Sequence, residues 1–302
     1  MRKIIVTAAA VLLATGGVVY SDPGESAASF LRIGVGAKPA AMGEAYAGVT
    51  GDLMSLYSNP AGLSTLFGYE FGFSHAIWFE DISYSNIAAG GNMLDGYVAL
   101  GVNYLSVGSI RKADNLGNRL QSSYTPSDLL ITAGYARIIG DISAGAALKI
   151  IHSEIDGDSA TGVAVDLGAQ KYFGVLNAGV VIQNLGTPME FRSESDPLPL
   201  AVRAGISYPF LLSGLDITAV SEAAYSNEVP FTFNAGVNAD YPVSEFILSL
   251  RVGFKSNAEG LDALSRLTTG FGVEYADIAF DYSFASFEDL GMTHRISLGY
   301  RM

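Results

Sequence analysis

The chain has 302 residues, with 30 acidic and 17 basic side chains and a formal net charge of −13. This balance argues against a nucleic-acid partner, because phosphate binding needs clustered Lys and Arg. The absence of cysteine excludes a disulfide framework and a thiolate metal site. Charged residues are only 16% of the chain and apolar residues 49%, which is unusual for a water-soluble domain.

The first segment has the residue order of a secretory signal peptide. Arg2 and Lys3 precede an apolar run over residues 4–19, and the small polar residue Ser21 follows. We therefore expect residues 1–21 to be removed on export. A retained anchor is the alternative, but the run is shorter than the ~20 residues of a membrane helix. No later stretch is apolar enough for such a helix.

Residues 22–68 lack the pattern of the rest of the chain and are too short to form a domain. The Ala- and Gly-rich stretch 39–49 predicts a short helix that begins at Pro39. Residues 52–57 predict a second helical turn, ended by Asn59-Pro60. We expect this segment to act as a plug that packs into or under the following domain.

The sharpest local motif in this segment is Asn59-Pro60-Ala61-Gly62. Asn tolerates turn conformations, Pro fixes φ, and Gly62 would allow a left-handed residue to complete a chain reversal. In the structural interpretation, the turn is the corner that joins the plug to the first strand. In the functional one, it holds the plug over a lumen as part of a gate.

Alternation of apolar and polar residues with a period of two dominates residues 69–302. In residues 97–105, for example, Val98, Leu100, Val102 and Tyr104 share one face. Such windows predict fourteen strands, near residues 69–78, 81–91, 96–108, 128–139, 141–153, 160–173, 175–185, 198–209, 214–226, 230–241, 244–256, 265–275, 277–285 and 293–302.

The predicted connections alternate between short links and longer polar loops, and aromatic residues gather where strands end. Both features are typical of bacterial outer-membrane barrels, which have short turns at one rim and aromatic girdles at both interfaces. The expected fold is therefore all-β: a 14-stranded antiparallel transmembrane β-barrel over residues 69–302. The last strand has an apolar face that ends on Met302, as expected of a strand read by the barrel insertion machinery.

Charged residues fall on the predicted inward faces of these strands. They comprise Lys149, Asp166, Arg203, Asp216, Glu222, Asp240, Arg251, Lys255, Arg266, Glu274, Asp277, Asp281, Arg295 and Arg301. Charges of both signs inside a barrel usually form paired networks, because an unpaired buried charge costs several kcal/mol. A structural network that fills the lumen is one interpretation, and a solute pathway through a gap in it is the other.

No pattern of residues points to catalysis, a metal or a cofactor. His75, His152 and His294 are far apart in the sequence and lack zinc-ligand spacing. Asp156-Gly157-Asp158 lacks the ligand series of a calcium loop and predicts a hairpin turn instead. We therefore expect that the protein is not an enzyme.

Several motifs resemble the PorV/PorQ family of outer-membrane proteins. They occur in order along nearly the whole mature chain, at residues 30–43, 45–47, 56–63, 74–75, 78–79, 81–84, 184–186, 196–200 and 291–298. That family is similar to the long-chain fatty-acid transporter barrels, which have fourteen strands and an N-terminal plug. This chain departs from the usual barrel pattern at Met302, where Phe is common.

The resemblance implies a place in the bacterial outer membrane and a role in protein export, as a shuttle or attachment platform of the type IX kind. The implied partners are outer-membrane lipid, the barrel insertion machinery and exported cargo proteins. Transport of a hydrophobic small molecule is a second hypothesis, and it predicts an apolar pocket beside the plug. A soluble secreted all-β adhesion protein, such as a sandwich, is a third and also explains the alternation.

Overall fold

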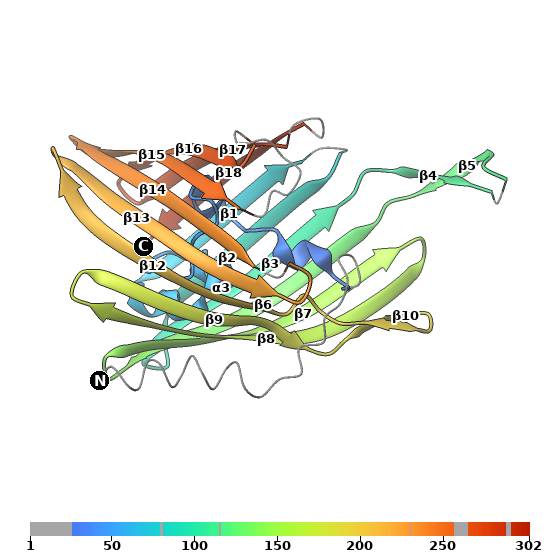
Figure 1. Cartoon of the computed structure of the whole chain (residues 1–302), viewed down its shortest axis with the longest axis horizontal. Coiled ribbons are helices and arrows are strands. Elements are labelled where there is room, and N and C mark those ends of the chain that lie inside the picture. The colour runs from blue at the N-terminus through green and yellow to red at the C-terminus, as the bar shows by residue number, and fades with distance from the viewer. Residues whose placement is uncertain (1–25, 79–80, 115, 230, 257–264, 288–290) are drawn as a thin grey trace.

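The structure is a computed structural model that describes residues 26–78, 81–114, 116–229, 231–256, 265–287 and 291–302. The predicted signal peptide, residues 1–21, lies outside these residues. Within them, fourteen antiparallel strands form a closed barrel, in which the last strand pairs with the first (Figure 1). Helical segments from the N-terminal part of the chain lie inside it.

The barrel strands confirm all fourteen sequence predictions. They are β1 (Tyr69–Ile77), β2 (Ser83–Met93), β3 (Gly96–Ser106), β6 (Ser127–Ile139), β7 (Ile142–Ile155), β8 (Asp158–Phe173), β9 (Leu176–Gly186), β12 (Ala201–Leu212), β13 (Leu215–Ser226), β14 (Thr232–Val243), β15 (Phe246–Lys255), β16 (Leu267–Tyr275), β17 (Ile278–Ser286) and β18 (Met292–Arg301). The observed ends lie close to the predicted ones, with the largest displacement at β12.

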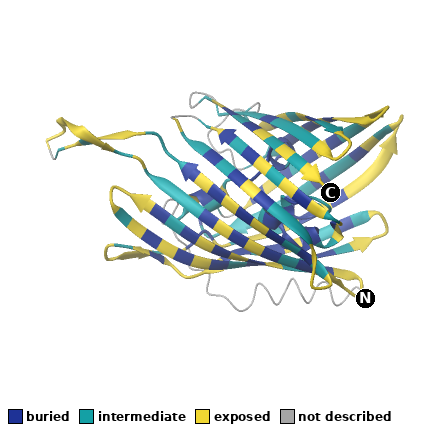
Figure 2. Cartoon of the chain, turned by 180° about the vertical axis from the view of Figure 1, so that it is seen from behind, coloured by how far each residue is buried: buried dark blue, intermediate teal, exposed yellow. Residues whose placement is uncertain are grey.

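Each strand presents an apolar outer face and a small or polar inner face. Figure 2 shows the resulting alternation of exposed and buried residues along the strands. Leu100 on β3 is 58% exposed and Leu250 on β15 is 70% exposed, whereas Asn103 and Arg251 on the same strands are buried. An outward apolar band around a closed barrel is the pattern of a transmembrane barrel, and it rules out a soluble sandwich. No described helix is long and apolar enough to span a membrane.

The two rims of the barrel differ in the length of their connections. One rim has only short turns, whereas two loops at the other rim contain hairpins that the sequence did not predict. The hairpin β4 (Ile110–Ala113)–β5 (Arg119–Tyr124) projects away from the barrel (Figure 1). The hairpin β10 (Met189–Phe191)–β11 (Glu194–Asp196) packs against β8 instead, and Met189 is fully buried.

The N-terminal helical segments are shorter than expected. They are η1 (Ser29–Arg32), α2 (Ala37–Ala41), α3 (Ser55–Ser58) and η2 (Pro60–Thr65). The short helix predicted to begin at Pro39 is present as α2, but it begins two residues earlier and ends at Ala41. Residues 44–49 run without helical structure because side chains of the barrel wall bond their backbone, as described below.

The conformation predicted for Gly62 is also wrong. Gly62 lies within η2 and is not among the described residues with positive φ. It is required for close packing instead, since a Cβ there would lie 2.6 Å from the carbonyl oxygen of Val49. The motif does not form the corner before β1 either, because η2 packs against β6, β7 and β8.

Candidate functional site

Residues 37–66, called the plug from here on, are fixed to the barrel wall by hydrogen bonds. Glu222 on β13 accepts the backbone N–H groups of Tyr46 (3.0 Å) and Ala47 (2.8 Å) with one carboxylate oxygen. Its other oxygen accepts Nε of Arg203 on β12, at 2.6 Å. One buried carboxylate therefore joins two strands of the wall to the plug.

Amide and hydroxyl side chains of the wall bond the next plug residues. Gln170 donates to the carbonyl oxygens of Ala47 and Val49, each at 2.9 Å. Asn177 and Ser207 both donate to the carbonyl oxygen of Gly48, each at 2.8 Å. These bonds satisfy backbone groups that a helix would have satisfied internally, and they make the plug a fixed partition.

Asn59, the first residue of the predicted gate turn, belongs to the same set of bonds. It is fully buried, its side-chain nitrogen donates to the carbonyl oxygen of Ala47 at 2.7 Å, and its side-chain oxygen accepts the N–H of Ala61 at 3.2 Å. Pro60, Ala61 and Gly62 are buried against the wall. The motif thus anchors the plug to the wall and is not the corner before β1 that the structural interpretation predicted.

Glycines in the wall let the plug backbone come close. A Cβ on Gly253 of β15 would lie 2.0 Å from the backbone nitrogen of Gly43, and one on Gly179 of β9 would lie 2.0 Å from the carbonyl oxygen of Ala47. Real Cβ contacts are never this short, so a side chain at either position would displace the plug.

Glu44 of the plug forms an ionic contact with two further strands. It lies 2.6 Å from Nζ of Lys255 on β15 and 4.0 Å from the guanidinium of Arg295 on β18. Burial, the largest single effect, raises the pKa of Glu44, but Lys255, Arg295 and Arg203 together outweigh it. The pKa of Glu44 therefore lies below its ordinary value.

Asp52 forms a second ionic contact at the opposite side of the plug. Its carboxylate accepts the hydroxyl of Tyr46 at 2.6 Å and lies 3.4 Å from Nζ of Lys38. Burial raises the pKa of Asp52, but Lys38 and the bonds from Tyr46 and Met54 outweigh it, so the pKa lies below its ordinary value. Both plug carboxylates are thus stabilised in the charged form.

The predicted lumen charges mostly contact one another. The ion pairs within this set are Lys149–Asp166 (2.6 Å), Arg203–Glu222 (2.6 Å), Arg251–Asp281 (2.6 Å) and Arg301–Glu274 (3.5 Å). Asp240 accepts hydrogen bonds from Ser249 and Asn238 (2.5 and 2.7 Å). Asp216 is exposed next to the short turn before β13, and no ion pair within 4.0 Å includes it among the described residues.

Sequence reasoning missed the charged partners outside the predicted set. Glu44 and Asp52 lie in the plug, and Glu70 on β1 pairs with Arg301 at 3.0 Å. No local pattern marks these residues, because their partners are distant in the sequence. The glycines on the inward faces were the one available signal that another chain segment approaches the wall.

A cavity of about 1010 Å³ lies between the plug and the long-loop rim. The strand ends at this rim line its sides, for example at Asp128, Ser226 and Thr232, and plug residues such as Tyr46 and Tyr57 form its floor. We call it the outer cavity. Its volume is at the upper end of the ~300–1,000 Å³ typical of small-molecule sites.

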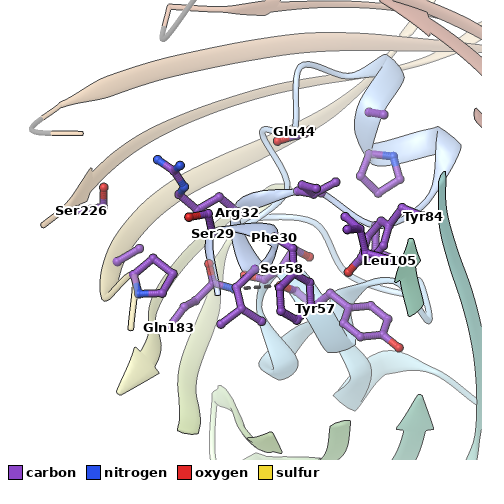
Figure 3. Close-up of a pocket in the computed structure, with 18 of the residues that line it drawn as sticks. Ser29, Phe30, Arg32, Glu44, Tyr57, Ser58, Tyr84, Leu105, Gln183 and Ser226 are labelled. Atoms are coloured by element: carbon purple, nitrogen blue, oxygen red, sulfur yellow. Dashed lines mark hydrogen bonds between the residues drawn. The ribbon is translucent and has the colours of Figure 1, made fainter. Parts of the chain in front are cut away.

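The outer cavity has one apolar and one polar side. Figure 3 shows Phe30, Tyr57, Tyr84 and Leu105 gathered on one side, with Arg32 and Gln183 on the other. The apolar side continues through a buried cluster on β1, β2, β3, β6 and β7 that includes Leu130 and Ile151. The polar side is formed by residues of β9 and of strands β12 to β18.

A smaller cavity of about 100 Å³ lies on the other side of the plug. Its walls include several charged residues, among them Lys38, Asp52 and Glu274. Pro39 and Met54 line both cavities, so the partition between them is thinnest at these two residues. The plug therefore separates the large outer cavity from a much smaller inner one.

Residues 26–35, here called the N-terminal segment, line the outer cavity and are bonded to the loops at the rim. Glu228, in the loop before β14, bonds both Ser26 and Arg32. The N–H of Ala27 donates to the carbonyl oxygen of Pro197 at 2.9 Å. Phe30 is buried and packs edge-on to Tyr84, with ring centroids 6.5 Å apart.

The structure also places the three histidines. All three side chains are on the outward face, and His75 and His294 lie on the paired strands β1 and β18, with His294 opposite Ile77. Each hydrogen-bonds a neighbouring hydroxyl: His75 to Ser85, His152 to Thr161 and His294 to Tyr282. Within the described residues, no group of three His, Asp or Glu side chains is arranged to hold a metal ion.

Solved outer-membrane barrels share this fold. The chain is similar to a TodX deltaS2S3 mutant monoaromatic hydrocarbon channel, with a TM-score of 0.64, 12% identity, and coverage of 89% of this chain and 99% of that one. It is also similar to the Pseudomonas putida toluene transporter TodX, with a TM-score of 0.61, 13% identity, and coverage of 88% and 96%. At such identities the similarity shows the fold alone.

No family model matches the chain, and no curated protein does. The PorV/PorQ resemblance and its export role therefore stay predictions. What is established is an outer-membrane type of barrel, similar in fold to channels and transporters of hydrophobic compounds.

Proposed function

We propose that the protein is an outer-membrane channel that binds a hydrophobic small molecule in its outer cavity and admits it toward the periplasm. The observation that carries this proposal is the outer cavity itself, with its apolar wall of Phe30, Tyr84 and Leu105 above a fixed plug. The fold shared with a toluene transporter supports the same function. We assign no catalytic step to the protein.

The orientation follows from the rims. Bacterial barrels have short turns on the periplasmic side and longer loops outside, so the outer cavity would face the exterior. Outer-membrane lipid would surround the apolar band, and the barrel insertion machinery would place the protein there. A ligand that passes through the plug would cross at Met54, whose flexible side chain separates the two cavities.

The protein carries its own reporter for a binding test. Trp78 is the only tryptophan in the chain and lines the outer cavity. Titration of the detergent-solubilised protein with toluene should give a saturable change in tryptophan fluorescence. Leu105→Glu, which puts a charge on the apolar wall, should abolish the change. The lipid-facing control Val102→Thr, on the same strand, should retain it. A signal that rises linearly in all three proteins would contradict the proposal.

A further inference from the structure

We infer that the outer cavity selects an uncharged amphipathic ligand, whose apolar part lies against the β2–β7 wall and whose hydroxyl or amide group hydrogen-bonds to Asn234 on the opposite wall. This inference rests on the proposed function and adds the chemical class of the ligand. The inference is based on three observations: an amide oxygen without a hydrogen-bond partner, neighbouring charges that are already paired, and an apolar surface across the same cavity.

Asn234 provides the polar contact. Its side chain is only 8% exposed and lines the outer cavity from β14. Its side-chain oxygen has no hydrogen-bond partner within the described part of the chain. A buried polar group without a partner is unfavourable, and a ligand that reaches this oxygen with a hydrogen-bond donor would satisfy it. The amide can both donate and accept, so a hydroxyl or amide group complements it.

The charges on either side of Asn234 are already paired. Asn234 lies opposite Glu222 on β13 and opposite Lys255 on β15. Glu222 is bonded to Arg203 and Lys255 to Glu44, each at 2.6 Å. An ionic head group would have to break one of these pairs and leave its partner buried and unpaired, which is costly. The neighbouring charges therefore disfavour a carboxylate or ammonium ligand and leave the amide as the available contact.

The apolar contact lies across the cavity. Tyr84, Leu105 and Leu130 on β2, β3 and β6 are all less than 6% exposed, and Phe30 packs against the same cluster. Their position on the β2–β7 side, away from β14, gives the cavity its two-sided character (Figure 3). A pure hydrocarbon would satisfy this wall and leave Asn234 unpaired, whereas an alcohol or a neutral amide would satisfy both.

Three ligands with one aromatic ring test the inference: toluene, benzyl alcohol and benzoate. We would measure their dissociation constants with the full chain in detergent by Trp78 fluorescence, each corrected for its partition into detergent. Benzyl alcohol should bind about tenfold more tightly than toluene, as expected for one hydrogen bond worth about 1.4 kcal/mol. Benzoate should bind most weakly of the three.

Variants of Asn234 assign the preference to this residue. Asn234→Leu, which keeps the branched shape but replaces the amide with two methyl groups, should weaken benzyl alcohol about tenfold and leave toluene unchanged. Asn234→Ser should retain part of the preference because a hydroxyl remains. Phe233→Leu, on the outward face of the same strand, is the matched control and should behave as the wild type. The upward shift of folded barrel on boiling in detergent gels verifies that each variant is folded.

The outcomes separate this inference from the function on which it rests. Saturable toluene binding with no preference for the alcohol, or a preference that Asn234→Leu retains, would overturn the inference alone. Tightest binding by benzoate would overturn it as well. No saturable binding by any of the three ligands would overturn both the inference and the proposed function.

Discussion

The fixed plug depends most on Glu222, and its replacement gives the sharpest prediction. Glu222→Ala removes the acceptor of two plug N–H groups and leaves the Arg203 guanidinium without its carboxylate. Removal of one partner of a buried ion pair costs about 3–5 kcal/mol. Glu222→Gln keeps an acceptor oxygen but removes the charge, and should cost less. Such losses are large beside the ~5–15 kcal/mol of a whole domain.

Urea unfolding of the refolded protein in lipid or detergent, followed by Trp78 fluorescence, measures these costs. The double variant Arg203→Met/Glu222→Met should be less destabilised than Glu222→Ala, because it leaves no unpaired buried charge. Asp216→Ala, on the exposed end of the same strand, is the control and should change stability by less than about 0.5 kcal/mol. If the free energy of unfolding of Glu222→Ala lies within that margin of the wild-type value, the account of the plug is wrong.

Four further predictions test other contacts. Glu44 and Asp52 have lowered pKa values, so their ion pairs should stabilise the plug fully at pH values above the ordinary pKa values of 4.5 and 3.8. This stabilisation should be lost as the pH falls below those values and the carboxylates become protonated. Glu44→Gln should therefore make the urea midpoint less dependent on pH. Gly253→Val should displace the plug and raise conductance in planar bilayers. Met54→Ala should open a small conductance between the cavities, whereas the buried plug control Met42→Ala should not. Leu148→Arg, in the middle of β7, should cost about 2–4 kcal/mol in lipid, but Leu116→Arg, exposed between β4 and β5 outside the barrel, should cost nothing.

The sequence predicted the barrel because its signal is local. A strand between lipid and lumen must alternate its side chains, so a window such as residues 97–105 already determines which face of β3 points outward. Connection lengths then give the two rims. The hairpins within two long loops were missed because their strands, of three to six residues, are too short for alternation to be recognised.

The plug could not be predicted in the same way, because its conformation is set by the wall. Residues 44–49 have helix-forming alanines, but Glu222, Gln170 and Asn177 supply the hydrogen bonds that a helix would have made. The inward charges Arg203 and Glu222 were identified, yet nothing local showed that Glu222 also holds the plug. Asn234 was missed as a site because a polar residue on an inward face is ordinary, and only its missing partner distinguishes it.

Uptake by intact cells tests the channel most directly. A host with a poorly permeable outer membrane would express one of three proteins: the wild type, Ala224→Phe or Ala223→Phe. The Phe side chain of Ala224→Phe fills the outer cavity from β13, whereas that of Ala223→Phe, at the neighbouring position, points to lipid. The account predicts faster uptake of a labelled aromatic alcohol with the wild type and Ala223→Phe, and uptake at the empty-vector rate with Ala224→Phe. Equal uptake with all three proteins, or no gain over the vector with the wild type, would contradict it.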